Sequence, residues 1–261
     1  MSSADGMPDR RPAARIVLIR HGESTFNATK VFTGLLDAPL SVRGRQQIAT
    51  AAGLIAQAHL HPSRIISSPL QRAHDTAAGL QQLLAPRVPI ETSWRLAERD
   101  YGCMTGVSKH ECRQRWGDAA FFAWRRTMHG APPPASEEQR SGWPHIPTVD
   151  LGPLVPGSSE CLADVVERVR WLWADVSHSM WARPDSLITI VAHGNSLRAL
   201  SLLIGRLSDE EVEGFNIPAA QPLVYEFDEP GDLQPRNRFG RYLDPATATI
   251  EAARVEAEGG T

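Results

Sequence analysis

Two histidines, His21 and His193, follow apolar runs at residues 16–19 and 187–192, and each is followed by glycine. Aliphatic runs without polar alternation are typical of strands that are covered on both faces of a parallel sheet. Ligands of open α/β sheets bind beyond the carboxyl ends of such strands. One histidine at a strand end is more often a structural residue, but two with the same surroundings are harder to attribute to packing. We therefore expect a ligand site between two imidazoles.

Three charged residues are further candidates for this ligand site. Arg20 precedes the first histidine, and Arg72 falls in the first turn of a helix predicted after Pro69. Backbone N–H groups of a first turn attract anions, so an arginine there fits a bound phosphate, although a solvated helix face is the alternative. Glu98 lies in a stretch crowded with ionisable side chains and is a candidate acid or base, with an ion pair to a neighbouring arginine as the alternative.

These residue types indicate phosphoryl transfer. Guanidinium groups offer paired donors to phosphate oxygens, a histidine can act as a nucleophile, and a protonated carboxyl can release the leaving oxygen. A metal site is disfavoured because no His-x-x-x-His or acidic cluster accompanies either histidine. The sequence also lacks a GxxxxGK[ST] loop and a GxSxG elbow. Phosphohistidine chemistry is the interpretation that remains.

The elements that must position these groups alternate between strands and helices. Ser41 and Ser208 are predicted helix N-caps, the latter with Glu211 at capping-box spacing. The pattern predicts a three-layer α/β fold with a doubly wound, mainly parallel sheet and helices on both faces. Strands are expected at residues 16–19, 64–68, 88–92, 187–192 and 223–227, and helices after Ser41 and Pro69, at 108–128 and 162–180, and from Ser196 and Ser208.

One domain is expected over residues 15–243, between a flexible leader at 1–14 and a tail at 244–261 that is weakly helical or disordered. The leader has Asp5, Asp9 and two prolines but no apolar core, so it does not resemble a signal peptide. Residues 129–160 contain seven prolines, which argues against regular helix there. We interpret residues 99–160 as a lid inserted into the domain.

The composition limits the classes of partner that the protein is expected to bind. The chain has 261 residues, 42% of them hydrophobic, and a net charge of −3, which gives no general attraction to nucleic acid or an anionic membrane. Its apolar runs are far shorter than the roughly 20 residues of a membrane helix. Three cysteines without a CxxC pair favour a reducing cytoplasm. A small anionic metabolite is the expected partner.

Four motifs carry a family resemblance. Leu18-Ile19-Arg20-His21-Gly22-Glu23-Ser24, Phe32-Thr33-Gly34, Glu98-Arg99 with Tyr101-Gly102, and Ala192-His193-Gly194-Asn195-Ser196 resemble the cofactor-dependent phosphoglycerate mutases of the histidine phosphatase superfamily. The likeness runs from about residue 15 to about residue 228. Trp124-Arg125-Arg126 and Asn216-Ile217-Pro218 look specific to the mutase branch.

The resemblance implies an enzyme that interconverts 3-phosphoglycerate and 2-phosphoglycerate and is primed by 2,3-bisphosphoglycerate. It also implies that no metal is used. Members of the family are often oligomeric, so the resemblance is compatible with a homodimer or homotetramer, but the sequence does not decide the oligomeric state. By the same resemblance, His21 is the phosphorylated nucleophile, Glu98 the proton donor and acceptor, and Arg20, Arg72 and His193 hold the phosphoryl group. The matching substrate contacts are Ser24, Asn27, Thr33, Gly34, Tyr101, Lys109, Arg125, Arg126 and Asn195.

Two rival functions stay open. A mutase must hold a second anionic group during transfer, and Lys109, Arg125 and Arg126 are cations that could do so from the lid, although a solvated helix face is the alternative. A phosphatase would use the same His21 on a small phosphorylated metabolite. A non-catalytic module that binds phosphorylated ligands is the third hypothesis, and the presence of every proposed reactive group argues against it.

Overall fold

The computed structural model describes residues 11–183 and 185–257, whose centre is a six-stranded sheet in the order β3-β2-β4-β1-β5-β6. Strands β1 to β4 pair in parallel, whereas β5 pairs antiparallel with β1 and β6 pairs antiparallel with β5. The predicted mainly parallel sheet is therefore confirmed. The strands are β1 (Ala14–Arg20), β2 (Arg64–Ser67), β3 (Ile90–Thr92), β4 (Ser186–Ala192), β5 (Leu223–Phe227) and β6 (Arg241–Tyr242).

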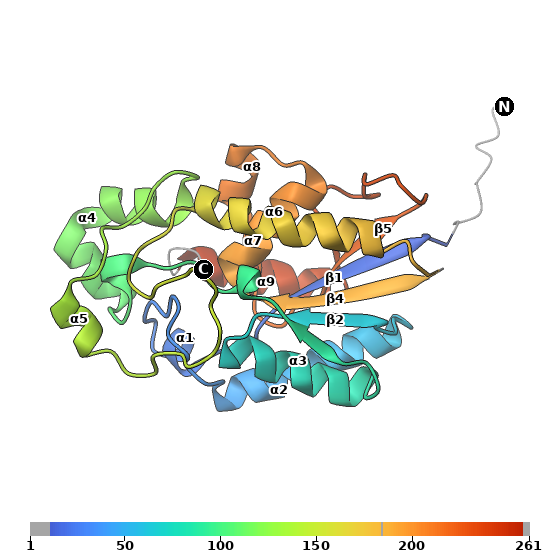
Figure 1. Cartoon of the computed structure of the whole chain (residues 1–261), viewed down its shortest axis with the longest axis horizontal. Coiled ribbons are helices and arrows are strands. Elements are labelled where there is room, and N and C mark those ends of the chain that lie inside the picture. Colours follow the sequence, from blue (N-terminus) through green and yellow to red (C-terminus); the bar gives the residue numbers. More distant parts are fainter. Residues whose placement is uncertain (1–10, 184, 258–261) are drawn as a thin grey trace.

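Helices cover both faces of this sheet (Figure 1). Successive side chains of β1 point to opposite faces, so Val17 and Ile19 pack with α2 and α3, while Ile16 and Leu18 pack with α6, α7 and α8. The helices are α1 (Thr25–Ala28), α2 (Val42–Gln57), α3 (Gln71–Leu84), α4 (Lys109–Arg126), α5 (Glu137–Ser141), α6 (Leu162–Ser179), α7 (Gly194–Gly205), α8 (Asp209–Gly214) and α9 (Pro245–Ala257), with short 3-10 helices η1 (Trp94–Leu96) and η2 (Gly102–Met104).

The central strand pair sets the position of both histidines. β1 and β4 lie side by side with Arg20 opposite Ala192, so the residue after each strand reaches the same edge of the sheet. The amide of His21 donates to the carbonyl of Ala192 at 3.0 Å. On the other side of β4, the amide of Ser68 donates to the carbonyl of Val191 at 3.0 Å. Sheet order thus brings three distant segments to one edge.

The segment predicted as a lid lies beyond this end of the sheet, where Figure 1 shows α4 and α5 close to α1. Phe32, Tyr101, Met104 and Phe121 form its separate apolar cluster. The expectation of no regular helix in residues 129–160 is wrong, because α5 forms between two proline groups. Its N-cap Ser136 accepts from the amide of Gln139 and completes a capping box, which stabilises a single short helix.

Three further boundaries differ from prediction. The expected helix at 108–128 becomes α4, which is kinked at Gly117, where φ is 78°. α7 begins at Gly194 with His193 as its N-cap, two residues before the predicted start at Ser196. Ala13 already donates a backbone hydrogen bond to Phe227 and β1 begins at Ala14, so the sheet takes in the end of the expected leader.

The remaining expectations concern the two ends of the chain. The first ten residues of the predicted leader lie outside the described residues. The tail, which the sequence left undecided, forms helix α9 over residues 245–257. None of the helices in the described part of the chain is long and apolar enough to cross a membrane.

Candidate active site

His21 lies at the end of β1 with its imidazole buried. Its Nδ1 is 2.7 Å from the carbonyl of Gly22, and because a carbonyl oxygen only accepts, Nδ1 carries the proton. Nε2 therefore presents its lone pair and accepts from Nε of Arg72 at 3.3 Å. Burial lowers the pKa of His21 well below its usual value, and the charges of Arg72 and Arg20 lower it further. The imidazole is therefore neutral at neutral pH, with an unprotonated Nε2.

Arg72 occupies the first turn of α3 as predicted, but the alternative of a solvated helix face is wrong because the side chain is only 1% exposed. Its Nη1 donates to the carbonyl of Leu36 at 2.7 Å and its Nη2 to that of Gly34 at 2.9 Å. Burial lowers the pKa of Arg72 to about 10, so it keeps its charge at neutral pH. Gly34 has a φ of +52°, which aims its carbonyl into this contact.

His193 faces His21 with ring centroids 5.0 Å apart and an edge-to-face geometry. Its Nε2 lies 2.8 Å from Oγ of Ser68, which follows β2. Burial lowers the pKa of His193 well below its usual value, and Arg72 and His21 lower it further. The sequence reading missed Ser68, although its place at the end of a predicted strand was a usable signal.

Glu98 is buried beside these imidazoles, in the loop after η1. Its Oε1 accepts from the amide of Arg99 at 2.8 Å and from the backbone and side-chain amides of Asn195 at 3.3 and 3.1 Å. The Asn195 side chain also donates to the hydroxyl of Tyr101 at 2.8 Å. The hydrogen bonds on this carboxylate thus come from amides rather than from an arginine side chain.

A narrow cavity of about 20 Å³ joins these groups. It brings together eight of the predicted site residues, and His193 and Asn195 contact its walls. The lining consists of Arg20, His21, Asn27, Val31, Phe32, Thr33, Gly34, Arg72, Glu98 and Tyr101. Motifs that are widely separated in sequence therefore form one pocket.

Ser24 does not line this cavity. Its hydroxyl donates to Oδ1 of Asn27 at 2.9 Å and accepts from the amide of Asn27 at 3.1 Å, which makes it the N-cap of α1. Ser24 therefore orients Asn27, which does line the cavity, and its contact with substrate stays a prediction.

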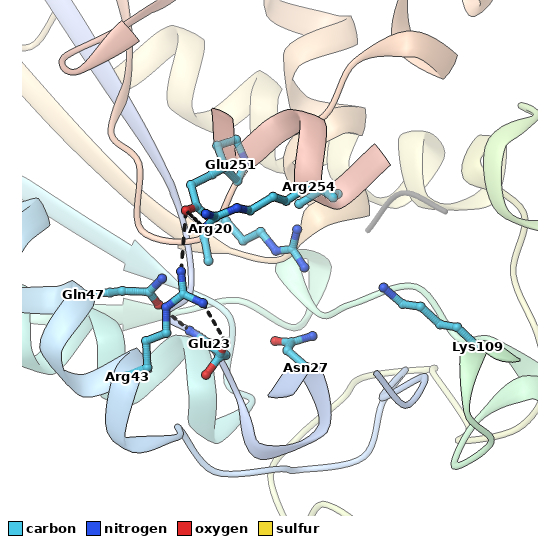
Figure 2. A pocket seen from close by; sticks show the side chains of 11 residues that line it. Arg20, Glu23, Asn27, Arg43, Gln47, Lys109, Glu251 and Arg254 are labelled. Carbon is cyan, nitrogen blue, oxygen red and sulfur yellow. Dashed lines mark hydrogen bonds and ion pairs between the residues drawn. The ribbon is translucent and has the colours of Figure 1, made fainter. Parts of the chain in front are cut away.

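A second pocket of about 120 Å³ adjoins the first and shares Arg20 and Asn27 with it. Figure 2 shows Lys109 from α4 on one side of this pocket and Glu251 and Arg254 from α9 above it. An ion pair of 3.5 Å joins Nη2 of Arg43 to Oε1 of Glu251. The C-terminal helix thus forms one wall of the outer pocket.

The structure does not place Arg125 and Arg126 in the lining of either pocket. Arg125 is buried over the rings of Phe32 and Phe121, at 5.1 and 4.8 Å from their centroids, and burial lowers its pKa to about 9. Nη1 of Arg126 donates to Oδ1 of Asn216 at 2.9 Å. The alternative of a solvated helix face is nevertheless wrong for both, because they are 1% and 9% exposed.

Two further arginines, Arg99 and Arg198, are buried like Arg125 and Arg126, and the sequence did not identify them as site residues. Arg99 stacks over Tyr101 at 4.8 Å, and its Nε and Nη1 have no hydrogen-bond partner among the described residues. Arg198 donates to Oδ1 of Asn195 at 3.0 Å and to the carbonyl of Val212. Their positions, next to Glu98 and one turn after Asn195, were the available signals. Four buried guanidinium groups behind the cavity can stabilise an anion.

The chain matches the family model described as histidine phosphatase superfamily (branch 1) over residues 16–233. The chain belongs to the histidine phosphatase superfamily. It is 38% identical over 246 residues to a 2,3-bisphosphoglycerate-dependent phosphoglycerate mutase of Thermobifida fusca, covering 94% of this chain and 98% of the relative. The mutase of Mycobacterium tuberculosis is 40% identical over 248 residues, covering 94% and 97%. The family resemblance seen in the sequence motifs is thereby confirmed.

Solved structures of phosphatases share the fold. A mycobacterial glucosyl-3-phosphoglycerate phosphatase in complex with VO3 superposes with a TM-score of 0.65 at 27% identity, covering 82% of this chain and 93% of the phosphatase. Among the described residues, no three His, Cys, Asp or Glu side chains are grouped so that they could hold a metal ion.

Proposed function

We propose that this enzyme interconverts 3-phosphoglycerate and 2-phosphoglycerate through a phosphohistidine at His21, primed by 2,3-bisphosphoglycerate. The observation that carries the proposal is the unprotonated Nε2 of His21, which follows from the proton on Nδ1 and which accepts from Arg72 next to His193. Nε2 attacks phosphorus, and the bond to the leaving oxygen breaks. Arg20, Arg72 and His193 hold the transferring phosphoryl oxygens.

Glu98 is the proposed proton carrier. Its carboxyl gives a proton to the leaving oxygen during transfer to His21 and accepts one from the attacking hydroxyl during transfer back. Asn195 and the amide of Arg99 hold its Oε1, so the carboxyl is directed by fixed amides. The same residue can serve both directions because the two steps are the reverse of each other.

A second group of cations favours a mutase. Between the two transfers, a mutase must keep its three-carbon acid bound, which requires positive charge beyond the phosphoryl pocket. The buried guanidinium groups of Arg99, Arg125, Arg126 and Arg198 lie behind Tyr101 and Asn195, and Lys109 lies on the outer pocket. The similarity to curated mutases over most of the chain supports the same conclusion.

Phosphatase activity at the same histidine is the second candidate, and the structural similarity to a phosphatase supports it. The two differ in whether water or a substrate hydroxyl takes the phosphoryl group from His21. Helix α9 forms a wall of the outer pocket, which supports the exclusion of water and therefore the mutase.

The deciding experiment follows 2-phosphoglycerate formation by coupling to enolase while inorganic phosphate release is measured in the same sample, with and without 2,3-bisphosphoglycerate. A mutase isomerises faster than it releases phosphate and depends on the bisphosphate. Phosphate release that exceeds isomerisation would establish the phosphatase instead. Ligand binding without phosphohistidine or turnover would identify a non-catalytic module.

A further inference from the structure

A buried ion pair lies at the start of α6, behind the loop that carries Glu98. Nε of Arg168 donates to Oε1 of Glu160 at 2.8 Å and Nη2 donates to Oε2 at 3.2 Å. The two side chains are only 6% and 9% exposed. Burying two charges is costly unless further hydrogen bonds satisfy them, so the other partners of this pair show what it holds.

Those partners are backbone groups on both sides of Glu98. Arg168 donates from Nη1 to the carbonyl of Arg95 at 2.5 Å and from Nη2 to the carbonyls of Ala97 and Glu98 at 3.0 and 3.2 Å. Oε2 of Glu160 accepts from the amide of Asp100 at 3.0 Å, and the amide of Glu160 donates to the carbonyl of Asp100 at 3.0 Å. The ion pair thus fixes the loop before and after Glu98.

We propose that Glu160 and Arg168 are positioning residues that set the place of the Glu98 carboxyl relative to His21. This inference rests on the proposed function for the role of Glu98. Arg168 lies on α6 and Glu160 just before it; α6 packs against α7 in the core, and α7 carries the Asn195 that holds Oε1. Loosening the pair frees the loop backbone on both sides of Glu98, so the carboxyl no longer reaches the leaving oxygen reliably.

A displaced general acid has a distinctive chemical consequence. In the transfer to His21, the N–P bond forms, the P–O bond breaks, and the proton of Glu98 moves to the leaving oxygen. An alkoxide leaving group from 2,3-bisphosphoglycerate needs that proton, whereas dinitrophenolate leaves as a stable anion. A misplaced Glu98 therefore slows the phosphorylation of His21 by 2,3-bisphosphoglycerate but not by the dinitrophenyl ester.

The test uses the full-length enzyme with Glu160→Gln or Arg168→Lys. Phosphorylation of His21 in a single turnover is measured with 2,3-bisphosphoglycerate and with 2,4-dinitrophenyl phosphate as donors. We expect a loss of about 10- to 100-fold with the bisphosphate, less than the roughly 10²–10⁴-fold of general acid catalysis because Glu98 is displaced and not removed, and little change with the aryl phosphate. Glu98→Gln supplies the reference pattern.

A matched control lies on the same helix. Arg170 pairs with Glu167 at 3.4 Å, but both are exposed, at 57% and 69%, so Arg170→Lys should change neither rate. If Glu160→Gln does not fold, as judged by thermal unfolding, Glu160→Asp keeps the charge and shortens the reach. Equal losses with both donors, or no loss with either, would overturn the positioning role. A wild-type enzyme that is phosphorylated by neither donor would instead refute the proposed function.

Discussion

Lowering the pH from about 7.5 to about 5.5 should weaken the folded state, because His21 and His193 are buried and uncharged there. Burial lowers the pKa of both imidazoles, and Arg72 lowers both further. The unfolded chain leaves both imidazoles in water, where their pKa is about 6.5. Below that pH the unfolded state binds more protons than the native state, so the free energy of unfolding falls as the pH falls.

The magnitude follows from proton linkage. A histidine that stays neutral in the native state loses about 1.4 kcal/mol of stabilisation between these two pH values. Two such histidines together give about 3 kcal/mol, a large part of a typical free energy of unfolding. Asp100 acts in the opposite direction, because burial raises its pKa and the native state then binds the extra proton more readily.

Urea unfolding at both pH values measures this effect, in buffers without phosphate because an anion bound to the site would itself stabilise the native state. The His21→Gln/His193→Gln double variant removes both imidazoles and keeps Asp100, so its stability should change with pH by about 3 kcal/mol less than that of the wild type. The double variant of two exposed histidines, His61→Gln/His110→Gln, is the control and should behave like the wild type.

The comparison has a clear refuting outcome. If removing His21 and His193 leaves the pH dependence unchanged, the two imidazoles are not held neutral in the native state. In that case Nε2 of His21 is not the free lone pair on which the nucleophile assignment rests.

Two other substitutions separate roles that we propose. His21→Ala should abolish phosphohistidine formation and turnover, whereas Arg125→Ala should mainly raise KM, and steady-state assays that show equal losses of kcat would contradict this division. Gly44→Ala should destabilise the fold by about 1–3 kcal/mol, since its Cβ would lie 2.1 Å from the carbonyl oxygen of Glu23, next to the active-site loop. Gly53→Ala in the same helix meets nothing within 4 Å and should stabilise it by about 0.5–1 kcal/mol, so similar urea midpoints for the two variants would refute the steric argument.

The sequence was sufficient to predict the reactive edge of the sheet because strand ends carry local signals. His21 and His193 each follow an unbroken apolar run, and the parallel pairing of β1 with β4 then places them together. Ser68 could not be assigned in the same way, since its contact with His193 depends on β2 being the next strand beside β4. Strand order is set by how the helices pack, and the local pattern does not contain it.

Side-chain contacts between distant segments could not be predicted from the sequence either. Arg125 and Arg126 were predicted as cations facing substrate, but the kink of α4 at Gly117 and the aromatic cluster around Phe32 set where they point. Glu160 and Arg168 gave no motif at all, because their partners are backbone atoms of the preceding loop. Such contacts follow from the packed fold rather than from spacing along the chain.

The difference between these arginines explains how the proposed site holds an anion. The charge of Arg168 is neutralised by Glu160, and its guanidinium group holds the backbone of the loop that carries Glu98. Around the cavity, Arg72 and Arg198 are bound mainly by carbonyl oxygens, which fix their direction without cancelling their charge. Burial lowers the pKa of both histidines, and the charge of Arg72 lowers it further; the same buried charge acts where the dielectric is low, so its effect on an incoming phosphoryl group is strong. We infer that a neutral His21 and a positively charged pocket are two results of burying the imidazoles together with these arginines.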